Sequence, residues 1–182
     1  MELNTDQYYH IYNRSINNEL VFHSENNYDY FLRKYQHYFS NYFDTITYCL
    51  MPTHFHFLVF VKSDDIIKLK NSVGIFLSSY TKALNIEQCR HGNLFQQHTK
   101  SRHVDKDSYL ISVASYIHQN PIRSGIVNKL EDWKYSSYLE YIGLRKNSFV
   151  KIDLLLNYFS SIEDFKTYSE VIIENKDEKY WI

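Results

Sequence analysis

The sequence predicts an α+β fold in which one antiparallel sheet of four strands carries two helices on one face. Three observations lead to this prediction. Short segments rich in aromatic and β-branched residues predict strands, longer segments with apolar residues every three or four positions predict helices, and the segments follow in the order β-α-β-β-α-β. This order is the split βαβ arrangement, ferredoxin-like or RRM-like, and we expect its second face to stay open for a ligand.

The first half of the chain contains a strand, a helix and a hairpin. The segment YYHIYNR (residues 8–14) is short and β-prone, and Ser24 is placed to cap a helix over residues 25–39. The segments TITYCLM (residues 45–51) and HFHFLVFV (residues 54–61) are separated by two residues only. Strands joined so closely should pair as a hairpin.

The second half supplies another helix, a fourth strand and a third helix. Ser63 is expected to cap the second helix, and residues 94–104 are expected to form the last strand. A further helix is expected over residues 107–119. It should stop there because Pro121 lacks an N–H group and disfavours helical geometry at Asn120. The remainder of the chain is expected to add C-terminal helices.

Length and composition favour a single compact unit. With 182 residues, of which 44% are hydrophobic, the chain can bury a core, and four glycines and two prolines leave little material for a linker. We expect a main domain over residues 1–145 and an acidic helical extension over residues 146–182 packed on it. Residues 161–182 contain six acidic residues and three lysines, which gives a net charge of -3.

The sequence argues against a membrane protein or a disulfide-stabilised one. The longest apolar run is interrupted by His56 and is far shorter than the roughly 20 residues that span a bilayer. The start MELNTDQYYH does not resemble a signal peptide. Cys49 and Cys89 show no paired spacing, so a reducing cytoplasm is the expected compartment.

Charge is informative through its distribution. A net charge of -1 and a pI of about 6.7 argue against a generally basic, DNA-coating protein. Residues 88–104 nevertheless contain Arg90, Lys100, Arg102 and three histidines with no acidic residue. This segment is the first place to expect a nucleic acid, although an ordinary solvated edge would have a similar composition.

His54 and His56 stand one residue apart in a predicted strand. Side chains alternate between the faces of a strand, so both imidazoles should point away from the helix-covered face and could begin a divalent metal site. Two simpler interpretations remain. The histidines could be surface or hydrogen-bonded groups, or they could hold a structural zinc ion together with Cys89 and His91.

Five segments carry a resemblance to a known family. They are YYHIYNR, YCLMPTHFHFLVF, GNLFQQHTKS, DSYLISVASYIHQNPIRSGIV and WKYSSY. In this order and at this spacing, the chain resembles the single-tyrosine HUH transposases of the IS200-like family, and most narrowly the REP-associated tyrosine transposases. The resemblance runs from about Tyr8 to Tyr138, and His54-Phe55-His56 fits the HUH pattern.

The resemblance implies a bacterial, nucleoid-associated enzyme that nicks single-stranded DNA next to a hairpin and rejoins it. Its nucleophile would be a tyrosine that becomes attached to the 5′-phosphate. Tyr116 matches the family position, four residues before the NP element, and helix geometry places Tyr116 and Asn120 on one face. Tyr109 and Tyr135 are the nearest rivals for this role.

The resemblance also implies a divalent cation, Mg²⁺ or Mn²⁺, that would coordinate the scissile phosphate. His54, His56 and Asn120 would be its protein ligands, with Gln119 as the alternative amide. Imidazole suits Mn²⁺ better than Mg²⁺, so activity with both ions is expected.

Residues for DNA contact follow from the basic segment and from the family-like motifs. The sequence departs from the common family pattern at Thr53, Phe95 and His98-Thr99, which bears on DNA recognition rather than on the chemistry. The candidates are Arg14, Phe95, Gln96, Lys100, Arg102 and Arg123.

Two function classes follow. The first is a DNA-cleaving and strand-joining enzyme. The second is a binding module without catalysis, since the split βαβ sheet is also the scaffold of RNA-binding domains. The joint presence of the HFH segment and the Tyr116/Asn120 pair favours the enzyme. The resemblance is compatible with a monomer and with a homodimer.

Overall fold

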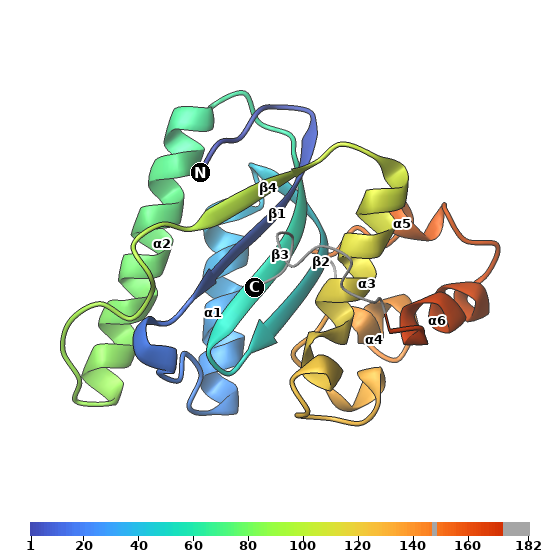
Figure 1. Cartoon of the computed structure of the whole chain (residues 1–182). Coiled ribbons are helices and arrows are strands. Elements are labelled where there is room, and N and C mark those ends of the chain that lie inside the picture. The colour runs from blue at the N-terminus through green and yellow to red at the C-terminus, as the bar shows by residue number, and fades with distance from the viewer. Residues whose placement is uncertain (147–148, 173–182) are drawn as a thin grey trace.

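The computed structural model describes residues 1–146 and 149–172. Its centre is an antiparallel sheet of four strands in the order β2-β3-β1-β4 (Figure 1). The predicted α+β fold of the split βαβ type is confirmed, including the hairpin between the two central segments. The strands are β1 (Gln7–Arg14), β2 (Phe43–Met51), β3 (His54–Val61) and β4 (Lys100–Val104).

Helices α1 (Glu25–Phe39) and α2 (Ile66–Glu87) cover one face of the sheet (Figure 1). The core between them is aromatic. Phe57 of β3 stacks on Tyr35 at 3.9 Å between ring centroids, and Phe55 packs on Phe31 at 5.3 Å. This packing fixes the orientation of β3, because residues that alternate with Phe55 and Phe57 must point to the opposite face.

Two predicted boundaries were wrong because side chains compete for local roles. The N-cap of α2 is Asp65, whose carboxylate accepts a hydrogen bond from the Lys68 N–H, while the Ser63 hydroxyl accepts one from the Asp65 N–H. Strand β4 begins at Lys100 rather than at residue 94. The apolar side chains of Leu94 and Phe95 turn into the core there instead of continuing a pleated strand.

The second face of the sheet is not open as expected. Helix α3 (Asp107–Arg123) lies across it, mainly over β2 and β3 (Figure 1). Its apolar stripe of Leu110, Val113 and Ile117 is buried. The expectation was wrong because α3 has an apolar stripe of its own, which it buries against this face of the sheet.

Helix α3 also continues through Pro121 to Arg123 instead of ending at residue 119. Proline cannot donate the hydrogen bond that a helical residue at this position would give to the Ile117 carbonyl. The side-chain amide of Asn120 donates to that carbonyl at 3.4 Å and to the Tyr116 carbonyl at 3.1 Å. The Asn120 side chain therefore supplies the hydrogen-bond donor that Pro121 lacks.

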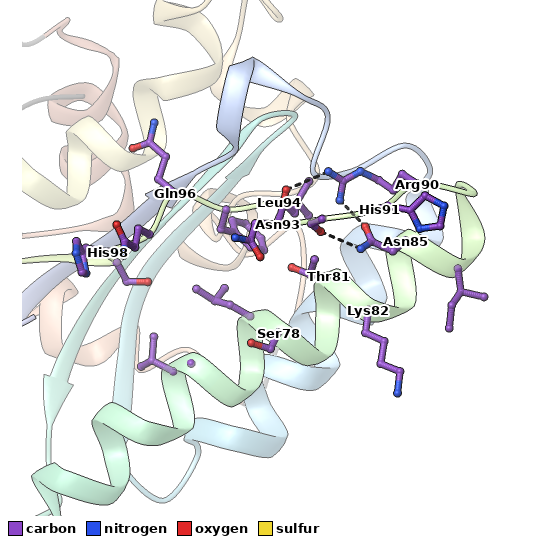
Figure 2. Close-up of a pocket in the computed structure, with 18 of the residues that line it drawn as sticks. Ser78, Thr81, Lys82, Asn85, Arg90, His91, Asn93, Leu94, Gln96 and His98 are labelled. Carbon is purple, nitrogen blue, oxygen red and sulfur yellow. Dashed lines mark hydrogen bonds between the residues drawn. The ribbon is translucent and has the colours of Figure 1, made fainter.

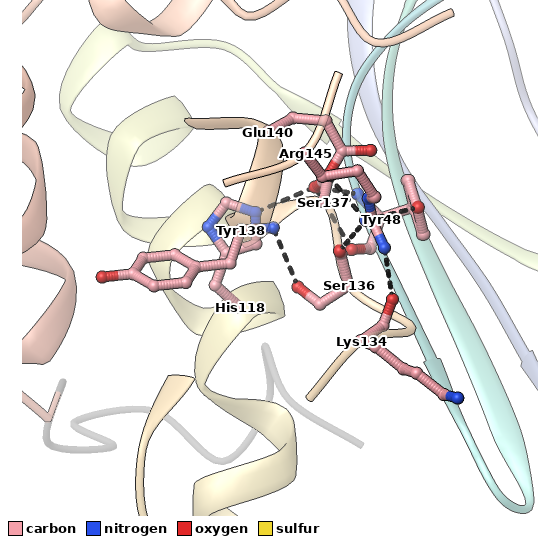
Figure 3. Close-up of polar contacts among 8 residues, drawn as sticks. All are labelled: Tyr48, His118, Lys134, Ser136, Ser137, Tyr138, Glu140 and Arg145. Atoms are coloured by element: carbon pink, nitrogen blue, oxygen red, sulfur yellow. Dashed lines mark hydrogen bonds and ion pairs between the residues drawn. The ribbon is translucent and has the colours of Figure 1, made fainter. Parts of the chain in front are cut away.

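The segment after α3 packs against the β2 edge and α3. Figure 3 shows its polar centre, where Arg145 pairs with Glu140 at 2.6 Å and donates to the Tyr48 hydroxyl at 2.9 Å. Phe165 of α6 is fully buried and stacks on Tyr141 at 4.9 Å. The short helices of this segment are α4 (Tyr138–Tyr141), α5 (Asp153–Leu156) and α6 (Ile162–Glu170).

The expected division into a main domain over residues 1–145 and an acidic extension over residues 146–182 stays a prediction. Residues 147–148 and 173–182 of that extension lie outside the described residues. In the part of the chain that is described, none of the helices combines the length and the apolar character needed to cross a membrane.

Candidate active site

The pairing register of β1 and β3 places polar side chains of both strands next to each other, on the sheet face that α3 covers. Tyr12 lies opposite His56 and Arg14 lies opposite His54 in the antiparallel pair. His54 and His56 share the face opposite Phe55, as the alternation predicted. His10, two residues before Tyr12 on β1, therefore shares this face.

His56 is fully buried and hydrogen-bonds to a second buried histidine. Its Nδ1 lies 2.9 Å from Nε2 of His10, and the two rings stack at 5.1 Å. Burial lowers the pKa of His10 to about 3, with a smaller contribution from Arg102, and burial also holds the pKa of His56 well below its usual range. Both rings are therefore neutral near pH 7. The Nε2 of His56 has no hydrogen-bond partner among the described residues.

His54 lies at the rim of this cluster and is only partly buried. Its Nδ1 is 3.1 Å from the Thr53 hydroxyl, and its ring is nearly perpendicular to that of His56 at 5.1 Å. Burial, and secondarily the charge of Arg14, lowers the pKa of His54 to about 4. Neutral imidazole is the form that binds metal ions.

Helix α3 brings Tyr116 onto the histidines. The Tyr116 ring lies 6.0 Å from the His56 ring and 6.4 Å from the His10 ring, both edge to face. Only 3% of Tyr116 is exposed, and the Arg123 guanidinium lies 5.5 Å from its ring centre. The rivals lie elsewhere: Tyr135 stacks on Tyr28 at 3.5 Å, and Tyr109 is two turns earlier on α3.

The two amides considered as metal ligands have different surroundings. Asn120 lies one turn after Tyr116 on the same helix face, and its Nδ2 is bound to the carbonyls of α3. Its Oδ1 is the atom of this amide that is able to bind a metal. Gln119 instead donates from Nε2 to the carbonyls of Ser169 and Val171, each at 2.8 Å, at the end of α6.

Four of the predicted DNA-contact residues surround the histidines and Tyr116. Arg14 lies opposite His54, and Arg102 lies opposite His10 with its Nε 3.5 Å from the Tyr12 hydroxyl. The other two are Lys100, whose Nζ is 5.9 Å from the Tyr12 ring centre, and Arg123 over Tyr116.

The other two predicted DNA contacts, Phe95 and Gln96, differ from each other. The Phe95 ring is buried between α1, α2 and β3, near Phe31 and Phe55, so it offers no face to a DNA base. Gln96 is exposed and its side chain points away from α2 (Figure 2), while its N–H donates to the Arg14 carbonyl at 2.9 Å.

The zinc alternative lacks support in this arrangement. Cys89 and His91 line a groove of about 1040 Å³ between α2 and residues 89–99, along with Arg90 and Asn85 (Figure 2). This groove is not lined by His54 or His56, so Cys89 and His91 are not grouped with these two histidines. Within residues 1–146 and 149–172, no three histidine, cysteine or acidic side chains form a metal-binding group. The donor set of two imidazoles and one amide oxygen stays a prediction.

His10 and Tyr12 were not singled out by the sequence reading, although both lie in the segment YYHIYNR. The signal was available in part, because alternation places residues 10 and 12 on one face of their strand. The pairing of that strand with the strand of His56 brings His10 and Tyr12 beside His56. This pairing depends on the tertiary structure.

Comparison with known proteins adds an independent line of evidence. No model of a known protein family matches the chain. A Haemophilus influenzae protein bearing the name of a REP-associated tyrosine transposase is 26% identical over 106 residues, 53% of this chain and 59% of that protein. A solved structure of a REP-associated tyrosine transposase bound to a REP hairpin superposes with a TM-score of 0.64, over 83% of this chain and 94% of that one.

The resemblance to the REP-associated tyrosine transposases is confirmed. The match to the solved transposase has 13% sequence identity and shows a shared fold. The match to the Haemophilus influenzae transposase spans 59% of the length of that protein, a little over half. What those transposases bind and catalyse is therefore a matter for proposal in this chain.

Proposed function

We propose that the protein is a metal-dependent single-stranded DNA endonuclease and strand transferase. It cleaves next to a DNA hairpin through a covalent 5′-phosphotyrosine at Tyr116, as a transposase of the REP-associated type would. The observation that supports this most directly is the packing of the Tyr116 ring on His56 and His10. A tyrosine nucleophile must lie beside the cation that holds the scissile phosphate, and this packing brings the Tyr116 ring beside the candidate ligand His56.

His54, His56 and Asn120 fit a divalent cation, Mg²⁺ or Mn²⁺. The buried Nε2 of His56 has no partner among the described residues, and a cation would give this nitrogen one. When bound, the ion supplies a Lewis acid that polarises the scissile phosphate and neutralises charge on its oxygens. Imidazole ligands favour Mn²⁺, while the amide and phosphate oxygens suit Mg²⁺.

Tyr116 carries the covalent step. Its phenolic oxygen attacks phosphorus, so a bond between that oxygen and phosphorus forms as the bond from phosphorus to the 3′ oxygen breaks. The phenol loses its proton to solvent, and the departing 3′ oxygen takes up a proton from solvent. The phosphodiester energy is retained in the phosphotyrosine, and attack by a second 3′-hydroxyl rejoins DNA without an external energy source.

The basic side chains around the site suit a DNA backbone. Arg14, Arg102 and Arg123 approach the histidines and Tyr116 from β1, β4 and α3. Arginine binds phosphate through paired hydrogen bonds and stabilises charge that develops on its oxygens. Only 3% of Tyr116 is exposed, so we expect neighbouring side chains to move when a phosphate binds beside it.

The partner we propose is single-stranded DNA with a hairpin. The solved relative is bound to a REP hairpin, and this chain shares its fold over most of both lengths. The alternative of a simple RNA-binding sheet is less well supported. Such sheets stack bases on exposed aromatic rings, whereas His10 and Tyr12 on the corresponding face are buried.

The test is covalent capture. Labelled single-stranded DNA with a hairpin is incubated with the protein and Mn²⁺ and run on a denaturing gel. We expect a protein-DNA adduct with the wild type and with Tyr109→Phe, and none with Tyr116→Phe or after chelation. An adduct that persists in Tyr116→Phe would show that another residue is the nucleophile. Chelation should leave the melting temperature nearly unchanged, and unfolding on chelation would indicate structural zinc instead.

A further inference from the structure

The hydrogen bond between His10 and His56 permits two proton arrangements. Both rings are buried, and the 2.9 Å contact joins Nε2 of His10 to Nδ1 of His56, so one of these two nitrogens donates and the other accepts. Either His10 donates from Nε2, or His56 donates from Nδ1. These arrangements give His56 opposite tautomers, because a neutral imidazole has its proton on one nitrogen only.

The burial of His56 distinguishes the two. If His10 donated, the Nε2 of His56 would carry a hydrogen with no acceptor among the described residues, inside a fully buried ring. If His56 donates, its Nε2 instead presents a lone pair. A lone pair at a buried, unpartnered nitrogen is the state that a cation can satisfy, whereas an N–H there repels one.

We infer that His10 is the positioning residue of the metal site. It accepts the proton of His56 Nδ1 and so fixes both the tautomer and the ring orientation that leave Nε2 for the cation. This inference rests on the metal site of the proposed function and adds a residue to it. Histidine ligands generally donate their second N–H to a neighbouring acceptor in this way, usually a carboxylate or a carbonyl.

The surroundings of His10 suit an orienting role rather than direct ligation. Its Nε2 is 2.9 Å from the His56 nitrogen, which leaves no room for a cation between the two atoms. Its ring is held by Tyr12 at 4.8 Å and Tyr116 at 6.4 Å and is 1% exposed. The other HUH histidine has a parallel arrangement, because His54 Nδ1 contacts the Thr53 hydroxyl at 3.1 Å.

Two substitutions separate orientation from packing. In His10→Gln the amide oxygen can take the place of Nε2 as acceptor, and in His10→Leu an apolar group of similar size cannot. Manganese affinity is measured from the free Mn²⁺ signal in electron paramagnetic resonance. We expect His10→Leu to weaken Mn²⁺ binding about 10–100-fold and His10→Gln to stay within about threefold of the wild type.

Nitrogen-15 spectra of the histidine side chains give a second readout. They report which ring nitrogen carries the proton, and we expect the Nδ1–H tautomer at His56 in the wild type and in His10→Gln. Observation of the Nε2–H tautomer would overturn the inference. A cation-dependent shift of a His10 nitrogen as large as that of His56 would make His10 a ligand and also overturn it. The wild-type spectrum decides the matter if His10→Leu does not fold.

Control variants keep the two proposals apart. His54→Ala should abolish Mn²⁺ binding, and Tyr12→Phe, which keeps a ring beside His56, should preserve it. Wild-type protein that binds no Mn²⁺ would refute the metal site of the proposed function. Wild type that binds, with His54→Ala defective and His10→Leu unchanged, would refute the role of His10 alone.

Discussion

The Tyr116 ring meets the His56 ring edge to face at 6.0 Å, with an interplanar angle of 89°. The two residues come from α3 and β3, which are distant in the sequence, and the contact exists because α3 crosses the second face of the sheet. It brings the candidate nucleophile beside a candidate metal ligand.

Asn120 should have two separable roles, one in the helix and one in the metal site. We expect Asn120→Ala to lower the free energy of unfolding by about 1–2 kcal/mol, because the Ile117 carbonyl loses its donor beside Pro121. It should also weaken Mn²⁺ binding. Denaturant unfolding and Mn²⁺ titration measure the two effects.

The double variant Asn120→Ala/Pro121→Ala is the matched test. The alanine N–H at position 121 can donate to the Ile117 carbonyl, so stability should recover while Mn²⁺ binding and adduct formation stay defective. Recovery of Mn²⁺ binding together with stability would contradict a ligand role for Asn120. A double variant no more stable than Asn120→Ala would contradict the helix role.

The arginines around the site should contribute additively to DNA binding and to its salt dependence. Removing one phosphate contact from a single strand lowers the slope of log affinity against log salt by about 0.7. We therefore expect Arg14→Gln and Arg102→Gln each to weaken hairpin DNA binding and to flatten this slope. Fluorescence anisotropy titrations at several salt concentrations measure the affinity and this slope.

Lys68→Gln is the matched control, because Lys68 lies on α2 on the other side of the sheet and is exposed. It should leave both affinity and slope close to wild type. If Lys68→Gln changed the slope as much as the arginine variants do, the DNA would not be confined to the face that carries Tyr116.

His118 should make the protein acid-sensitive. It is buried, its Nε2 is 2.9 Å from the Ser137 hydroxyl (Figure 3), and burial lowers its pKa to about 3. The unfolded chain takes up this proton near pH 6.5 and the folded one only near pH 3, so stability falls as pH falls across that window. The loss from His118 by pH 5 is about 2 kcal/mol.

In His118→Gln this proton uptake is absent, so the loss of stability between pH 7 and pH 5 should be about 2 kcal/mol smaller than in the wild type. His37→Gln, at an exposed position on α1, should keep the wild-type pH dependence. Unfolding free energies at a series of pH values measure the difference. Identical profiles for His118→Gln and the wild type would show that His118 is not a neutral buried group in the folded state.

Local patterns were sufficient for the elements whose signals are local. The periodicity of the first helix, with Ser24 as its cap, predicted the observed bounds Glu25–Phe39, and the two-residue connection predicted the β2–β3 hairpin. The failures at Ser63, at residue 94 and at Pro121 share one cause. In each case a neighbouring side chain or the core supplied an interaction that propensity does not include.

Sequence alone determined the order of the elements, the shared face of His54 and His56, and the family resemblance that selected Tyr116. These depend on chain periodicity and motif spacing, which are one-dimensional. The tertiary structure decided that α3 covers that face and that His10 hydrogen-bonds to His56. It also decided that the Gln119 side chain binds the end of α6, while the Asn120 side chain binds the Ile117 carbonyl beside Pro121. Those contacts join residues far apart in the chain, and packing between elements sets them.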